Sequence, residues 1–296
     1  MPKSTATTPP PEIPAALSFA GFFRVLSGRP QHPIGEDGRM ALSDHFRELR
    51  ARLIRVAVYL LVGTIVALFF YDQLLEIINR PYDKARELLG EDVNTMPVIT
   101  GVGAPLLLQL KLCGVAGIVG TSPLWLFEIW GFLVPGLHAH EKRWTRIFVA
   151  IAGPMFMAGV ALGYFILPKG IQVLLSFTPG YVQSLVEYGT YFSFVTRMLL
   201  VFGVAFEIPL FVVMLNLVGV VKGKALGRAR PLIIIGTFVF AAVATPSTDP
   251  FSMLALAIPM VLLFFLAEVV ARFVDRGRER RAAQTEHWSD DEISAI

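Results

Sequence analysis

IFVAIAGPMFMAGVALGYFILP, at residues 147–168, is the stretch that decides the fold class, because it contains no charged side chain. A helix needs about 20 mostly apolar residues to cross roughly 30 Å of hydrocarbon. The whole chain has the same character, since 54% of its 296 residues are hydrophobic and only 17% are charged. Soluble domains carry about 25% charged residues. The sequence therefore predicts an all-α integral membrane protein.

Five further apolar stretches flank this one. Together they predict six transmembrane helices, at residues 53–71, 105–127, 147–168, 191–220, 232–243 and 251–270. We expect Pro209 to kink the fourth helix, because proline has no N–H to donate along the helix. The fifth stretch is short for a full crossing, so we expect its end to lie in thinned bilayer or in the shelter of the protein.

Lysine and arginine are concentrated in alternate connections between these stretches. One side of the membrane would hold Arg47, Arg50, Arg52, Arg55, Lys142, Arg143, Arg146, Lys222, Lys224, Arg228, Arg230, Arg272, Arg276, Arg278, Arg280 and Arg281. Because basic residues favour the cytoplasmic side, this asymmetry predicts that both termini are cytoplasmic. The formal net charge of +3 then reflects topology, and we expect no nucleic-acid partner.

Two segments on the opposite side are too long for simple turns. Residues 73–89 predict an amphipathic helix broken at Pro81, and residues 170–187 form the second segment. Such segments either pack on the ends of the spans as an extracytoplasmic cap or lie in the membrane interface as anchors. We favour the cap.

The two ends of the chain differ from its apolar middle. Residues 1–39 have a proline-rich opening and no long apolar run, so we expect a disordered extension. No cleavable signal peptide is predicted, and Met40 is an alternative start. Residues 40–275 are predicted to form the membrane domain, and residues 276–296 a charged, flexible cytoplasmic tail. The single cysteine, Cys113, rules out an intrachain disulfide.

Motifs for enzyme chemistry are not found in this sequence. His140 and Glu141 begin like a zinc-protease helix, but Trp144 stands where the second histidine would be needed. Asp249 and Glu207 are two carboxylates for intramembrane proteolysis in principle, yet they share no local motif. We therefore expect no enzyme, no cofactor and no metal.

Three carboxylates lie where an acid is unexpected. Glu207 is near the middle of an apolar stretch, where a charge costs about 2.5–3.5 kcal/mol on insertion scales and by default marks a functional site. Glu48 and Glu141 both lie in strongly basic segments. Without any ligand, Glu48 would pair with Arg52 four residues later, and Glu141 would offset the dipole of the third helix.

Four motifs make a family resemblance specific. They are HFRELRARL at residues 45–53, WGFLVPGL at 130–137 with HEKR at 140–143, FGVAFEIP at 202–209, and TP at 245–246 with DPFS at 249–252 and AIPM at 257–260. In this order, and across about residues 40–275, the chain resembles the TatC family, the receptor subunit of twin-arginine protein translocases. The resemblance implies a glove-like bundle of six helices with both termini in the cytoplasm.

The resemblance also implies a binding site for signal peptides. In the family, the glutamates that match Glu48 and Glu141 hold the paired arginines of a signal peptide. Arginine forms bidentate bonds to carboxylate that lysine cannot copy. Phe132 and Leu137 would supply an apolar wall. The basic surround, which includes Arg50, would repel other peptides and hold the site against anionic lipids.

Glu207 and Asp249 take a different role under this resemblance. The position of Glu207 implies a contact with single-span partner subunits of the TatA and TatB types and with the apolar part of the signal peptide. The alternatives are structural: a polar network inside the bundle for Glu207, formed with Gln109, Lys111, Thr196 or Arg197, and an N-cap of the sixth helix for Asp249. The resemblance further implies self-association, a bacterial cytoplasmic membrane, and export of folded proteins driven by the proton motive force.

Two features depart from the family pattern, and two other functions remain open. Met253 stands where glutamine is common, and Ser247 and Thr248 lengthen the turn before Asp249. A proton-coupled transporter with Glu207 as the carrier would show a repeat between its halves, and none is seen for the segment around Glu207. A passive scaffold for membrane helices would tolerate neutralisation of both Glu48 and Glu141.

Overall fold

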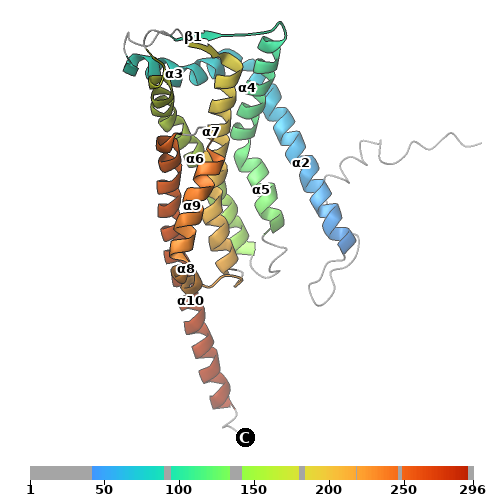
Figure 1. Ribbon diagram of the computed structural model, residues 1–296. Coiled ribbons are helices and arrows are strands. Elements are labelled where there is room, and N and C mark those ends of the chain that lie inside the picture. Colours follow the sequence, from blue (N-terminus) through green and yellow to red (C-terminus); the bar gives the residue numbers. More distant parts are fainter. Residues whose placement is uncertain are drawn as a thin grey trace, which may run out of the picture. The chain divides into compact units, whose positions relative to one another are not determined.

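The computed structural model describes residues 42–89, 95–133, 142–179, 184–217, 219–245 and 249–292. The chain divides into two compact units, Met1–Val58 and Tyr59–Ile296. The described part of the first unit is the beginning of one helix, α2. The other helices and strands belong to the second unit (Figure 1). The predicted extension at residues 1–39 lies outside the described residues.

Apolar helices dominate the described residues. Four are long and apolar enough to cross a membrane: α2 (Leu42–Phe69), α6 (Lys142–Ser176), α7 (Tyr188–Leu217) and α10 (Pro250–Glu292). A bent pair, α4 (Ala104–Gly120) and α5 (Ser122–Leu133), passes the same test together, and α9 (Arg230–Ala244) is a shorter apolar helix of 15 residues. These segments follow the order of the six predicted spans, and the all-α membrane fold is confirmed.

The second predicted span is not a single straight helix. It bends by 58° between α4 and α5 and continues past the predicted end, residue 127, to Leu133. Pro123 is the second residue of α5 and has no N–H to continue the bonds of α4, so a helix start is the position that it favours. The Thr121 N–H and hydroxyl both donate to the Gly117 carbonyl, at 3.0 Å and 2.7 Å, and these bonds close the end of α4.

The predicted break at Pro81 is wrong, because α3 (Tyr71–Leu89) runs through this proline. A proline inside a helix leaves the carbonyl four residues earlier without its donor. Here that carbonyl belongs to Ile77, and the Tyr164 hydroxyl donates to it at 2.9 Å. The next carbonyl, of Ile78, accepts from the Tyr191 hydroxyl at 2.6 Å. The Tyr164 side chain, from α6, thus replaces the lost helical bond, and Tyr191, from α7, adds a second contact to α3.

These contacts make α3 a cap on the second unit. In Figure 1, α3 lies across the ends of α6 and α7. The Tyr82 and Tyr191 rings meet edge to face, with centroids 5.5 Å apart, and the Gln172 amide donates to the Leu88 carbonyl at 3.3 Å. The cap is therefore confirmed over the alternative of interfacial anchors.

The second cap segment differs from its prediction. Helix α6 continues through Pro168 to Ser176, and residues 184–187 form strand β2 (Ser184–Glu187). This strand pairs in parallel with β1 (Thr95–Val98). The pairing joins segments almost 90 residues apart in the chain, which local sequence patterns do not encode. Helix α7 continues through Pro209, so this proline does not end the helix.

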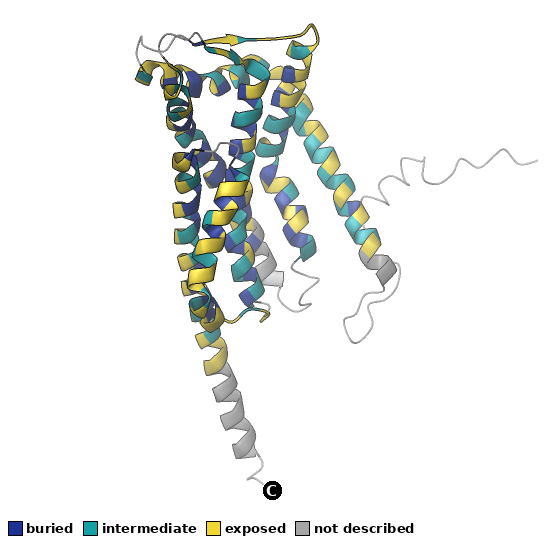
Figure 2. Cartoon of the chain, viewed as in Figure 1, coloured by how far each residue is buried: buried dark blue, intermediate teal, exposed yellow. Residues whose placement is uncertain are grey.

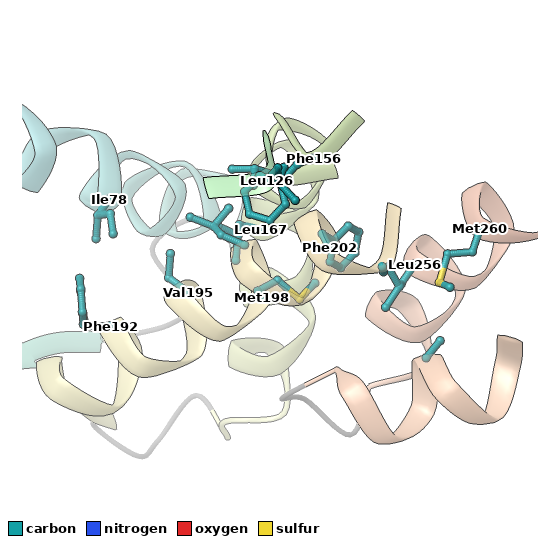
Figure 3. Packing of buried hydrophobic residues seen from close by; sticks show 14 of the residues in the cluster. Ile78, Leu126, Phe156, Leu167, Phe192, Val195, Met198, Phe202, Leu256 and Met260 are labelled. Atoms are coloured by element: carbon teal, nitrogen blue, oxygen red, sulfur yellow. The ribbon is translucent and has the colours of Figure 1, made fainter. Parts of the chain in front are cut away.

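The core of the second unit lies between α6 and α7 and extends to α10 (Figure 3). Small residues bring the first two helices close together. A Cβ added to Gly203 would lie 2.7 Å from the Phe156 ring, and one added to Gly163 would lie 3.1 Å from the Phe202 side chain. Phe156 and Phe202 themselves are fully buried. Glycine at these contacts lets aromatic rings pack against the facing backbone.

Large apolar side chains also cover the outside of the second unit, as the exposed residues of α9 in Figure 2 show. On this helix Leu232, Ile235, Val239 and Val243 are all exposed. In water such a surface would favour aggregation. In a membrane it would contact the hydrocarbon of the lipids. Beyond the predicted end of the last span, α10 continues as a helix to Glu292. The predicted flexibility of the tail stays a prediction.

Candidate functional site

Glu207 lies on α7, and among the described residues it has one side-chain donor. The indole N–H of Trp130, on α5, donates to its Oε2 atom at 3.1 Å. The other oxygen, Oε1, is buried and has no hydrogen-bond partner within the described residues. A carboxylate in such a place retains the capacity to accept a further hydrogen bond.

Aromatic rings surround this pair. The Trp130 ring centroid lies 6.1 Å from that of Phe148 and 6.2 Å from that of Phe211. The structural alternative, a polar network with Gln109, Lys111, Thr196 or Arg197, is not seen among the described residues. Glu207 has Trp130 as its partner, and Thr196 donates to the Phe192 carbonyl. Trp130 belongs to the second family motif, but its contact with Glu207 joins residues 77 positions apart and carries no local signal.

Glu48, in the first unit, is paired within its own helix. Both Nε and Nη2 of Arg52 donate to its Oε1 atom, at 2.9 Å and 2.6 Å. The Glu48 side chain remains 25% exposed. The intrahelical pair expected four residues apart is therefore confirmed. Arg50, two residues further along the helix, is exposed.

The other predicted residues of the signal-peptide site are only partly described. Phe132 is half-buried near the end of α5. Glu141 and Leu137 lie outside the described residues. The structure thus does not test whether Glu48 and Glu141 form one site.

Asp249 caps a helix. Its Oδ1 atom accepts a 2.7 Å hydrogen bond from the Ser252 N–H, and α10 begins at the next residue, Pro250. A carboxylate before a first-turn proline is a favoured start of a helix. The capping alternative is confirmed, and the second oxygen, Oδ2, is buried without a hydrogen-bond partner in the described part of the chain.

Glu268, on α10, is a second carboxylate within a predicted span, and the sequence motifs did not single it out. Arg230 donates to its two oxygens at 2.7 Å and 2.8 Å, and Arg272 approaches Oε1 at 2.6 Å. The Glu268 side chain is only 6% exposed. The four-residue spacing of Glu268 and Arg272 predicts an ion pair within one helix. The bond to Arg230 joins α9 to α10 across 38 positions, and no local pattern predicts it.

Glu128 was also missed. It lies on α5, just beyond the predicted end of the second span, and is 4% exposed. The hydroxyl of Tyr59 donates to its Oε1 atom at 3.5 Å. A metal site is not indicated, because no group of three His, Cys, Asp or Glu side chains that could hold an ion occurs among the described residues.

Apolar helices of spanning length, with isolated carboxylates held by tryptophan, arginine or a helix start, define a multispanning membrane protein. The sequence model of the family described as "Sec-independent protein translocase protein (TatC)" matches residues 44–259. The chain belongs to the TatC family. Its relatives are named as components of a protein translocase, and the prediction that the chain is not an enzyme is confirmed.

Individual relatives agree with this family. The TatC protein of Corynebacterium kroppenstedtii is 39% identical over 88% of this chain and 68% of its own length. That of Frankia casuarinae is 37% identical over 88% and 74%, and that of Escherichia coli K12 is 31% identical over 81% and 91%. A crystal structure described as the twin-arginine translocase receptor TatC superposes with a TM-score of 0.64 at 30% identity, over 77% of this chain and 99% of the solved one.

Proposed function

We propose that this chain is the multispanning receptor of a twin-arginine translocase, which binds the signal peptides of folded substrate proteins at its cytoplasmic face. The observation that supports this most directly is the docked guanidinium at Glu48. Two N–H groups of Arg52 reach one carboxylate oxygen at 2.6 Å and 2.9 Å. The Glu48 carboxylate is therefore able to hold a guanidinium group, as the proposal requires.

The internal arginine also explains selectivity. A substrate arginine exchanges one guanidinium for another at Glu48, so the carboxylate is never left without a cation. Lysine offers a compact ammonium in place of a planar fork and matches this geometry less well. Glu141 would hold the second arginine, with Phe132 and Leu137 as the apolar wall.

Basic residues around Glu48, among them Arg50, would hold this face against anionic lipids and repel ordinary positively charged peptides. Glu207, with an oxygen that still lacks a donor, would receive single-span partner subunits of the TatA and TatB types. Asp249 lies at the start of α10 and would belong to the same partner surface. We also propose self-association, a bacterial cytoplasmic membrane with both termini inside, and transport driven by the proton motive force.

Photo-crosslinking in membranes tests the proposal. Two signal peptides differing only in Arg-Arg versus Lys-Lys would be compared on the unmodified protein and on Glu48→Gln and Glu141→Gln. A hydrogen bond between charged groups contributes about 1.5–3 kcal/mol, so each substitution should weaken binding of the Arg-Arg peptide by about ten- to a hundredfold.

A matched control is available on α3. Glu76 pairs with Arg80 four residues later, at 2.8 Å, as Glu48 does with Arg52, but both side chains are exposed. Glu76→Gln should leave crosslinking unchanged. The proposed recognition of arginine would be refuted if both peptides bound equally. It would also be refuted if Glu76→Gln reduced crosslinking as much as Glu48→Gln.

A further inference from the structure

A cavity of about 630 Å³ opens beneath the cap of the second unit. Residues from α3, α4, α6, β2 and α7 line it. The volume falls in the range of about 300–1,000 Å³ that is typical of ligand sites. The cavity is separate from Glu207, whose partner Trp130 is not among the lining residues.

Two cations line this cavity, Lys111 from α4 and Arg197 from α7. Strands β1 and β2 are parallel, with Val98 opposite Glu187, and α4 and α7 follow them. At 1.5 Å per residue, Lys111 lies about 10 Å into α4 and Arg197 about 14 Å into α7. Both residues therefore lie about two turns or more inside apolar helices, and both are exposed, as cations that line an open cavity can be.

Neither cation has an ion-pair partner among the described residues. Among the described residues, neither Lys111 nor Arg197 is within ion-pair distance of a carboxylate. The one acid among the described residues that line the cavity, Glu187, is the last residue of β2 and accepts a hydrogen bond from the Thr190 hydroxyl. Positive charge at this depth is unfavourable unless an anion or water compensates it.

Most of the remaining wall is apolar. Ile171, Leu174 and Leu175 of α6 and Phe194 of α7 line the cavity. The tyrosine hydroxyls at its edge are already used, because Tyr191 donates to the Ile78 carbonyl and Tyr82 to Thr95. A fitting ligand carries negative charge at one end and hydrocarbon at the other.

We infer that this cavity binds an anionic phospholipid from the leaflet on the cap side, with its phosphate at Lys111 and Arg197 and an acyl chain along Leu174 and Leu175. This site is separate from the basic segment around Glu48, which belongs to the first unit. A free phosphate would satisfy the cations but would leave the apolar wall without a contact. The combination of both features favours the lipid.

Native mass spectrometry of the full chain, titrated with dioleoyl phosphatidylglycerol or dioleoyl phosphatidylcholine, tests the inference. The unmodified protein should bind phosphatidylglycerol about tenfold more tightly, which corresponds to about 1.4 kcal/mol. The preference should disappear in Lys111→Gln with Arg197→Gln. The control, Arg80→Gln with Lys169→Gln, removes two exposed cap-side cations that do not line the cavity and should keep it.

Two further variants test the inference even if the protein with Lys111→Gln and Arg197→Gln does not fold. Lys111→Arg with Arg197→Lys keeps both charges and should keep the preference, while Leu174→Asn should weaken phosphatidylglycerol binding by altering the wall. Soluble glycerol phosphate at millimolar concentration distinguishes a headgroup from a lipid and should not compete. The inference would be wrong if Lys111→Gln with Arg197→Gln kept the same preference for phosphatidylglycerol as the control variant. It would also be wrong if glycerol phosphate fully displaced the lipid.

Discussion

The carboxylates of α7 and α10 lie in two membrane helices, yet their surroundings differ sharply. Glu268 of α10 has three close nitrogen contacts, at 2.6–2.8 Å, from two arginines. Glu207 of α7 has one, from an uncharged indole at 3.1 Å, and one oxygen without a partner in the described residues. A fully bonded carboxylate links α9 to α10, whereas an incompletely bonded one can still receive a ligand.

The difference teaches that intramembrane charge alone does not identify a functional residue. Both glutamates would be taken as functional candidates, because placing a charge in a bilayer costs free energy. The number and type of their partners separates them, since a carboxylate that already has its cations gains little from a new donor. We therefore assign a structural role to Glu268 and propose a binding role for Glu207.

The largest expected effect comes from removing both cations at Glu268. Arg272→Leu with Arg230→Leu leaves this buried carboxylate without a counter-ion, which typically costs about 3–5 kcal/mol. We expect the lower end for Glu268, because protonation relieves part of the penalty. Denaturant titration in detergent micelles measures the free energy of unfolding.

A third substitution controls this experiment. Adding Glu268→Leu removes the uncompensated charge and should restore most of the lost stability, since hydrophobic replacement of a whole buried ion pair is often neutral. If the triple variant is as unstable as the double, the arginines stabilise the protein by packing and the ion-pair account of α9 and α10 is wrong.

A smaller effect is expected at Glu207. Trp130→Phe removes the one side-chain donor that Glu207 has among the described residues, and it should cost about 1–3 kcal/mol because a buried acceptor is left unsatisfied. In a Glu207→Leu background the same substitution should cost less, since both polar partners are then absent. Unfolding of all four proteins gives the coupling energy between the two residues. A coupling of zero would mean that the hydrogen bond contributes nothing.

The helix start at Asp249 should contribute less again. Asp249→Ala removes the acceptor of the Ser252 N–H and should cost about 1 kcal/mol, while Asp249→Asn keeps an oxygen acceptor and most of the stability. Thermal unfolding of the two variants checks this. Equal losses would indicate that the charge of Asp249, rather than its cap, matters.

The smallest effect is expected on α3. Glu76→Gln breaks an exposed ion pair with Arg80, and such pairs contribute little because water and salt screen them. Its unfolding midpoint should match that of the unmodified protein within error. A clear decrease would show that the ion pair helps to hold the cap, a role now assigned to Tyr164 and Tyr191.

Much of the fold could be predicted because span length and charge asymmetry are local properties of the sequence. The continuation of α3 through Pro81 could not, because the donor that rescues the Ile77 carbonyl is Tyr164, 87 positions away. The parallel pairing of β1 and β2 depends on a similarly distant contact. Pro123 favours a helix start and so indicates the bend after Gly120. The continuous apolar pattern of residues 105–127 nevertheless predicted one straight span.

The candidate site divides in the same way. The intrahelical pair of Glu48 and Arg52 and the cap at Asp249 follow from spacing alone, and the sequence anticipated both. The partners of Glu207 and Glu268 come from other helices, and their identity depends on which faces pack together. Glu141 and Leu137 lie outside the described residues, so their role stays a prediction.

The most direct test of the contrast between the two carboxylates measures stability and partner binding on the same variants. Glu207→Gln and Glu268→Gln would each be unfolded in detergent and, in membranes, photo-crosslinked to a single-span partner subunit of the translocase. We predict that Glu207→Gln has near-normal stability but is no longer crosslinked to the partner subunit. Glu268→Gln should instead be clearly less stable than the unmodified protein. A stable Glu268→Gln protein without the crosslink, or a Glu207→Gln protein with the crosslink intact, would contradict the account.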